Sequence, residues 1–252
     1  MSEVNSNGIV VTGGTGLLGR ELRTLMPEAS YPSHDAFDVT DPECLDGYLR
    51  HGRYRTIVHA AAFTSPPRVQ AEPATALQVN IVGTANVVQL CMTYDLRLVY
   101  ISTDYVFRGD KGYYREEDDL YPVNTYGWSK LGGECAARLY SRALIVRTSF
   151  GPNVFPFATA FVDQWTSREC VREIAAKLIP VIHHEMVGVI HVGGPRRTVY
   201  EYACSLDSRR QIRPISIHDI GCVIPRDASL DCHRFTSLVG DKAGASTNGA
   251  EL

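Results

Sequence analysis

Short apolar runs alternate along the chain with segments in which apolar residues recur at helical spacing. The runs lack the polar alternation of a one-sided strand, so they predict strands buried on both faces; they cover residues 8–12, 55–62, 98–102, 143–146 and 187–192. The helical segments cover residues 17–25, 74–91, 126–140 and 170–182. This alternation predicts an α/β fold: a Rossmann-type, doubly wound parallel sheet with helices on both faces.

Three glycines follow the first apolar run at intervals of three residues. Gly13 can turn the chain out of the strand, Gly16 lets the backbone approach a pyrophosphate, and Gly19 lets the next helix pack on the sheet. The free N–H groups and the positive end of that helix would then face the phosphates. The sequence therefore predicts a dinucleotide site, to which Thr15, Leu17 and Leu18 of the same turn also contribute.

The segment after the first predicted helix, where dinucleotide domains have their second strand, leaves the choice of cofactor open. Dinucleotide domains that prefer NAD usually place an acidic residue there, on the adenosine ribose. Residues 29–34 contain no acidic residue, and no Arg or Lys either; Asp38 and Val39 come later and are candidates for the adenine side. NADPH and NADH both remain candidates, with a preference for NADPH because no carboxylate would repel its extra phosphate.

A candidate catalytic group lies in the middle of the chain. Tyr126 and Lys130 are four residues apart, so a helix brings them to one face, and an ammonium near the phenol is expected to lower the phenol's pKa. Thr103 follows a predicted parallel strand, at the carboxyl edge where such sheets bind ligands. Thr103 would hold a substrate carbonyl, Tyr126 would exchange the proton, and Lys130 would also hold the nicotinamide ribose.

Bulk properties narrow the classes of partner. The 252 residues carry a formal net charge of -3, which gives no basic footprint for nucleic acid. The apolar runs are too short to span a membrane, and the first eight residues lack the apolar core of a signal peptide. None of the seven cysteines forms a Cys-x-x-Cys pair, so no metal site is predicted, and a cytoplasmic location is expected.

These motifs together resemble the extended short-chain dehydrogenase/reductase superfamily. The resemblance is carried by residues 13–19, 58–64, 79–80 and 101–107, together with Tyr126 and Lys130. Within that superfamily, Ser-Thr-Asp-Tyr-Val-Phe at 102–107 and Arg-Thr-Ser at 147–149 resemble dTDP-4-dehydrorhamnose reductases. The resemblance implies reduction of the C4 keto group of a nucleotide-linked 4-keto-6-deoxy sugar by NADPH or NADH, and it is compatible with a homodimer.

The resemblance also implies roles for particular residues. Thr103, Tyr126 and Lys130 would be catalytic, and Thr103, Asp104 and Phe150 would contact the sugar. The cofactor would be held by the glycine turn and by residues that follow later strands, namely Asp38, Val39, Ala60, Ala61, Ala62, Asn80, Tyr126 and Lys130.

The sequence departs from that family at three places. Phe63 replaces a Tyr, residues 66–70 replace an acidic run associated with a metal-linked dimer contact, and Phe150 replaces a Trp that packs on the sugar. The segment from Phe150 to Asp163 is also shorter than usual, where a helix covering the substrate would lie.

Two other readings compete with the reductase. Residues 114–118 and 124–126 resemble the regulatory β subunit of methionine adenosyltransferase, a non-catalytic protein that binds dinucleotide as a partner subunit. Other nucleotide-sugar-modifying enzymes of the superfamily form the third reading, although Tyr105 replaces the Glu that dehydratases carry after Thr-Asp. The expected organisation is a Rossmann domain at 1–150, a smaller C-terminal substrate lobe interleaved with the last strands at 151–240, and a disordered tail at 241–252.

Overall fold

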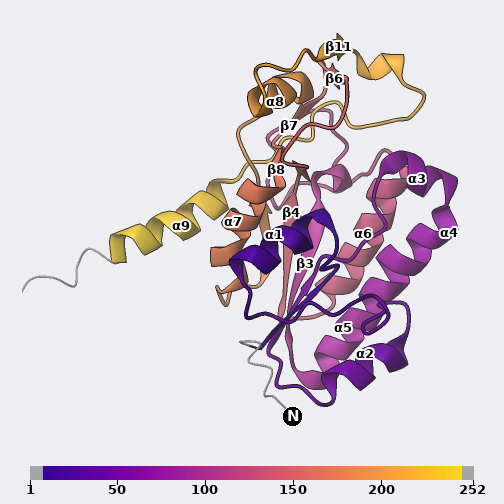
Figure 1. The fold of residues 1–252 in the computed structure, drawn as a ribbon, viewed down its shortest axis with the longest axis vertical. Helices are drawn as coiled ribbons and strands as arrows, with labels where there is room; N and C mark the ends of the chain where they lie inside the picture. The colour runs from indigo at the N-terminus through magenta and orange to yellow at the C-terminus, as the bar shows by residue number, and fades with distance from the viewer. Residues whose placement is uncertain (1–7, 246–252) are drawn as a thin grey trace, which may run out of the picture.

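The computed structural model describes residues 8–245, and its centre is a parallel sheet of five strands (Figure 1). The strands lie in the order β1 (Ile9–Thr12), β2 (Thr56–His59), β3 (Arg97–Thr103), β4 (Ala143–Thr148) and β9 (Gly188–Val192). Every neighbouring pair is parallel, and Ser30 pairs with Val10 on the outer side of β1. The predicted α/β fold with a parallel sheet is confirmed.

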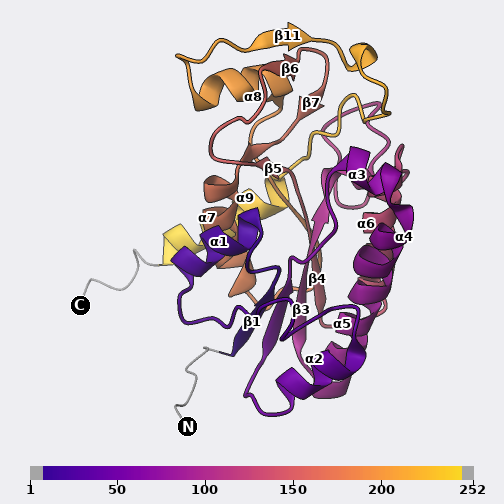
Figure 2. The same cartoon turned by 45° about the vertical axis from the view of Figure 1, so that its right-hand side comes forward.

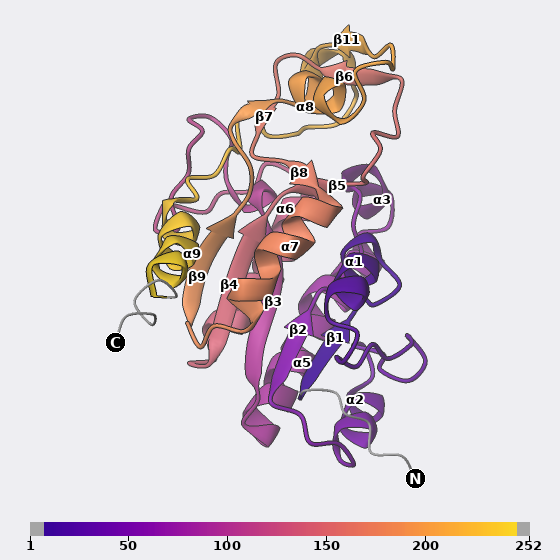
Figure 3. The same cartoon turned by 60° about the vertical axis from the view of Figure 1, so that its left-hand side comes forward.

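Helices cover both faces of the sheet, as Figure 3 shows. Successive strand residues point to opposite faces, so Ile9 and Val11 enter one core and Val10 enters the other. The first core is closed by α1 (Leu17–Leu25), α7 (Val171–Ile182) and α9 (His233–Ala245), and the second by α2 (Pro42–Leu49), α5 (Gly83–Tyr94) and α6 (Thr125–Arg138). Burial on both faces explains the continuous apolar runs of the strands.

The helix predicted at 74–91 is interrupted. Short helices α3 (Pro66–Ala71) and α4 (Pro73–Ala76) lead into a π-helical segment at Leu77–Val82, and α5 continues from Gly83 (Figure 2). The buried Asn80 lies in the π-helical segment, where its amide bonds both backbone groups of Phe63 and the hydroxyl of Ser129. These bonds join the π-helical segment to the loop after β2 and to α6.

A smaller lobe lies beyond the carboxyl ends of the strands (Figure 1). Its elements are β5 (Phe150–Gly151), β6 (Thr159–Phe161), β7 (Trp165–Thr166), β8 (Glu169–Cys170), β10 (Arg197–Thr198), α8 (Val199–Leu206) and β11 (Arg213–Ile215). The strands pair two by two, as β5 with β8, β6 with β11 and β7 with β10. A separate apolar core that includes Phe155, Ala160 and Tyr202 packs under α8, so the lobe has a hydrophobic core of its own.

The C-terminal prediction needs a correction. Helix α9 extends through Ala245, so residues 241–245 are helical and not disordered, whereas residues 246–252 lie outside the described part of the chain. The helix is anchored by Phe235, which is buried in the first core, and by Leu238 and Val239, which pack against that core. No helix between residues 8 and 245 is long and apolar enough to cross a membrane.

Candidate active site

The glycine turn after β1 is held closely against the end of β2. Gly13 has φ of 72°, and a Cβ there would lie 2.8 Å from the backbone nitrogen of Ala61. A Cβ on Gly19 would lie 2.3 Å from the carbonyl oxygen of Gly13. Both positions therefore require glycine, and the turn presents bare backbone at the start of α1.

A buried polar chain fixes this junction. Thr12 Oγ1 lies 2.8 Å from His59 Nδ1, and His59 Nε2 lies 3.1 Å from Thr84 Oγ1. Thr12 Oγ1 also accepts hydrogen bonds from the backbone N–H groups of Ala60 and Ala61. Burial lowers the pKa of His59 to about 3, so the imidazole is neutral and serves as a structural link between β1, β2 and α5.

A cleft of about 340 Å³ opens between the carboxyl ends of the strands and the lobe. Eight of the predicted site residues line it: Leu17, Ala60, Ala62, Thr103, Asp104, Tyr126, Lys130 and Phe150. Thr103 reaches it at the end of β3, while Tyr126 and Lys130 reach it from α6, which begins after the N-cap Asn124. Segments far apart in the sequence thus supply the predicted catalytic residues to one cleft.

Lys130 lines this cleft and is almost completely buried. Its Nζ donates to the carbonyl oxygen of Ile101 at 2.9 Å and lies 4.3 Å from the centre of the Tyr100 ring. Burial lowers the pKa of Lys130 to about 7, against the opposing charge of Glu134. The ammonium therefore titrates close to neutral pH.

The expectation of a lowered pKa for the phenol of Tyr126 is wrong. Burial raises the pKa of Tyr126 to about 12, and the Thr103 hydroxyl and the Arg168 charge only partly oppose it. The physical reason is that desolvation of the phenolate outweighs the attraction of nearby donors and cations. Tyr126 therefore carries its proton at neutral pH, which is the state that a proton donor needs.

Asp104 is a buried carboxyl beside the same residues. Burial raises its pKa to about 6, while the Arg168 charge and the Ser149 and Thr103 hydroxyls oppose the shift. Thr103 Oγ1 lies 3.1 Å from Asp104 Oδ1, and Thr166 Oγ1 lies 3.4 Å from Oδ2. The carboxyl is thus oriented by hydroxyls from β3 and β7.

Several predicted cofactor residues lie outside the cleft lining. Asp38 accepts hydrogen bonds from the backbone N–H and the hydroxyl of Thr40, and Val39 is buried in the second core. Asn80 clamps the loop at Phe63 against α6. The others belong to the glycine turn or the end of β2, namely Gly13, Thr15, Gly16, Leu18, Gly19 and Ala61. Of these residues, Asn80 holds the loop at Phe63 in place beside the cleft but does not line the cleft itself.

The structure adds two arginines that the sequence reasoning missed. Arg23 of α1 stacks over Tyr31, 4.8 Å from the ring centre, and its Nη2 lies 3.2 Å from where a Cβ on Gly14 would be. Arg168 lines the cleft from the lobe. No local motif marks either residue, because Arg23 comes from the helix and not from the second strand, and Arg168 follows a short irregular strand.

A buried ion pair holds α6, the helix that carries Tyr126 and Lys130, against the sheet. Glu134, one turn after Lys130, lies 2.6 Å from Nη2 of Arg147, and both side chains are completely buried. Glu134 also accepts a hydrogen bond from the hydroxyl of Ser102 at 2.9 Å. This network ties α6 to the ends of β3 and β4.

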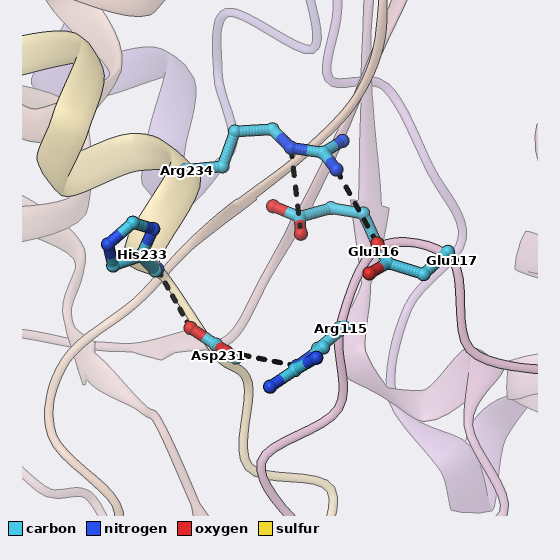
Figure 4. A pocket seen from close by; sticks show the side chains of 6 residues that line it. All are labelled: Arg115, Glu116, Glu117, Asp231, His233 and Arg234. Atoms are coloured by element: carbon cyan, nitrogen blue, oxygen red, sulfur yellow. Dashed lines mark hydrogen bonds and ion pairs between the residues drawn. The ribbon is translucent and has the colours of Figure 1, made fainter.

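A second cavity, of about 470 Å³, lies between the loop at 115–117 and the start of α9 (Figure 4). Its charged side chains face one another, with Arg234 near Glu116 and Glu117 and Arg115 near Asp231. The lining thus carries two arginines and three carboxyls, and it contains none of the residues predicted to be catalytic or to hold the cofactor or the sugar. Within residues 8–245 there is no cluster of three or more His, Cys, Asp or Glu side chains that could hold a metal ion.

The fold and these side chains define a Rossmann-type protein of the extended short-chain dehydrogenase/reductase class. Residues 7–169 match the family model described as RmlD substrate binding domain, and the chain belongs to that family.

Three relatives illustrate the range of the family. The chain is 28% identical to methionine adenosyltransferase 2 subunit beta of Rattus norvegicus, over 94% of this chain and 84% of that one. It is 32% identical to dTDP-4-keto-6-deoxy-D-glucose reductase of Streptomyces niveus, over 72% and 71%. It is similar, with a TM-score of 0.82 and 26% identity, to the structure of dTDP-4-dehydrorhamnose reductase from Bacillus anthracis in complex with NADP, which covers 91% of this chain and 92% of that one.

Proposed function

We propose that the protein is an NADPH-dependent reductase of the C4 keto group of a nucleotide-linked 4-keto-6-deoxy sugar. The observation that carries the proposal is the cleft in which Thr103, Tyr126 and Lys130 lie together, at the carboxyl edge of a dinucleotide-type sheet. The reductase relatives and the NADP-bound neighbour support this assignment. The cofactor and the sugar substrate would both have to bind in this cleft.

The residues present fit a dinucleotide. The turn at Gly13 and Gly19 has no room for side chains, so the backbone is open to a pyrophosphate at the start of α1. The stacked guanidinium of Arg23 lies beside Gly14 and over Tyr31, which follows the bridge between Ser30 and β1. In dinucleotide domains the adenosine ribose is usually held at the end of the second strand, the place that Ser30 takes here. A 2′-phosphate would pair with this cation, which favours NADPH over NADH.

The proposed chemistry assigns the proton to Tyr126. NADPH, when bound, supplies the hydride that reduces the C4 carbonyl. Tyr126 holds its proton because its pKa is about 12, and it would donate that proton to the carbonyl oxygen as negative charge develops there. Thr103 would donate a hydrogen bond to the same oxygen, and the Lys130 ammonium would stabilise the phenolate that remains.

Tyr126→Phe is the direct test of this assignment. General acid catalysis is typically worth ~10²–10⁴-fold, so turnover of NADPH with dTDP-4-dehydrorhamnose should fall by about that factor, while NADPH affinity stays close to the wild-type value. Tyr121→Phe is the matched control, because Tyr121 is exposed and lies outside the cleft. A fully active Tyr126→Phe protein would remove Tyr126 from the mechanism.

A non-catalytic dinucleotide-binding subunit is the second candidate. The observation that favours it is the similarity to methionine adenosyltransferase 2 subunit beta, which covers 94% of this chain. Tight NADPH binding by the wild type without any turnover of the keto sugar would favour this candidate over the reductase.

A further inference from the structure

Arg168 stands out among the cationic side chains around the cleft. It lies between β7 (Trp165–Thr166) and β8 (Glu169–Cys170), so the lobe carries it to the cleft wall opposite the sheet. The cleft lining contains two cations, Lys130 and Arg168, and a single carboxyl, that of Asp104. Lys130 is engaged with the carbonyl oxygen of Ile101 beneath the cleft, which leaves Arg168 as the cation of the lobe side.

The guanidinium of Arg168 is unpaired within the described part of the chain. Two neighbouring arginines of β10 and the preceding loop are paired, Arg197 with Glu169 at 2.9 Å and Arg196 with Asp227 at 2.7 Å. The Nε atoms of Arg168 and Arg197 are both buried without a hydrogen bond. Arg197 still bonds Glu169 through Nη2, whereas no nitrogen of the Arg168 side chain makes a hydrogen bond or ion pair within residues 8–245. A buried donor without a partner is costly, so its retention is explained if a ligand supplies the acceptor.

The charge of Arg168 acts on the carboxyl of Asp104, but the two side chains form no ion pair within the described residues. Asp104 is the single carboxyl of the lining, and burial raises its pKa to about 6, so the carboxylate itself is costly to form there. A second buried group without a partner, the hydroxyl of Tyr202, lies in the same corner. It is 3.3 Å from where a Cβ on Gly151 would be, and Cδ of Arg168 is 3.8 Å from that same point.

We propose that Arg168 binds the diphosphate that joins the nucleotide to the sugar of the substrate. This inference rests on the proposed function, because a nucleotide-linked sugar has its negative charge at the diphosphate, one sugar ring away from the carbonyl that Tyr126 and Thr103 address. The planar guanidinium can donate two parallel hydrogen bonds to phosphate oxygens. Arg168 is thus a residue for substrate binding and orientation, and it is separate from the glycine turn that would hold the cofactor.

Binding of free nucleoside diphosphates by the holoprotein tests the proposal without requiring turnover. In the presence of saturating NADPH, dTDP and UDP are titrated by calorimetry into the wild type, Arg168→Met and Arg168→Lys. We expect Arg168→Met to weaken both ligands by the same factor, about 10- to 100-fold, because the guanidinium contacts phosphate and not the base. Arg168→Lys should retain part of the affinity, since an ammonium keeps the charge but not the two-pronged geometry.

Arg172→Met is the matched control, because it removes the same charge from an exposed position at the start of α7 and outside the cleft. It should bind dTDP as the wild type does, and all variants should bind NADPH normally. Equal dTDP binding by Arg168→Met and the wild type would overturn the inference, as would a wild type that does not bind dTDP at all. A wild type that binds dTDP through Arg168 but does not turn over the keto sugar would instead refute the proposed reaction alone.

Discussion

Replacing Lys130 with methionine is expected to make the ligand-free protein more stable at neutral pH while abolishing its proposed activity. The side chain of Lys130 is 3% exposed, and burial lowers its pKa from 10.5 to about 7. Because the folded-state pKa is depressed, the unfolded chain binds more protons than the folded chain between these two values. Stability therefore rises with pH across this window, and the full cost of the buried ammonium applies below it.

The size of the effect follows from the same pKa. At pH 7 the depressed pKa corresponds to a cost of about 4 kcal/mol in the free energy of unfolding. Methionine has a similar length and no charge, but it loses the hydrogen bond from Nζ to the carbonyl oxygen of Ile101, worth about 1 kcal/mol. The expected net gain is about 3 kcal/mol at pH 7. At pH 10 the folded state holds the amine almost entirely neutral, and the pH is close to the amine's pKa in the unfolded state. The cost of burying the charge is then small and is offset by the lost hydrogen bond, so the gain in stability should nearly vanish.

Urea denaturation of wild type and Lys130→Met at pH 7 and pH 10, followed by circular dichroism, measures both values. The difference between the two proteins cancels the titration of groups that they share. The reasoning is refuted if Lys130→Met is less stable than wild type at pH 7, or if its advantage is as large at pH 10 as at pH 7. Confirmation would mean that the protein maintains a destabilising buried amine at this position, as functional sites often do.

Two further substitutions test the buried ion pair of α6 and the preference for NADPH. Arg147→Met should lower the free energy of unfolding by about 3–5 kcal/mol, because it leaves the carboxylate of Glu134 buried without its main partner. Arg138 also pairs with this carboxylate, but its side chain is half-exposed, so Arg138→Met should cost less than about 1 kcal/mol. Urea denaturation measures both losses. Arg23→Met should raise the Kd for NADPH about 10-fold or more and leave the Kd for NADH unchanged by nicotinamide fluorescence, whereas Arg20→Met should alter neither. Equal losses for the two cofactors would exclude Arg23 as the contact for the 2′-phosphate.

The sequence alone predicts the class of fold, because the signals for it are local. Strands buried on both faces must be apolar throughout, and the helices between them must carry one apolar stripe, so both periods can be seen in short windows. The glycine turn is equally local: Gly13 and Gly19 cannot carry a side chain next to the backbone atoms that approach them. Thr103, Tyr126 and Lys130 were found for the same reason, since a strand end and a four-residue helical spacing define where their side chains point.

Only the tertiary structure decided how these residues are charged and what accompanies them. Neighbouring groups on one helix led to the expectation of an acidic phenol, but the pKa of Tyr126 is controlled by how much packed protein surrounds it, and burial raises that pKa to about 12. Helix α9 packs on the first core through Phe235, and the π-helical turn is joined through Asn80 to Phe63 and Ser129, so both involve contacts between distant segments. Arg23 reaches Tyr31 because the chain turns back beside α1, and Arg168 reaches the cleft because the lobe folds over the sheet. Contacts between such segments leave no periodic pattern in the sequence.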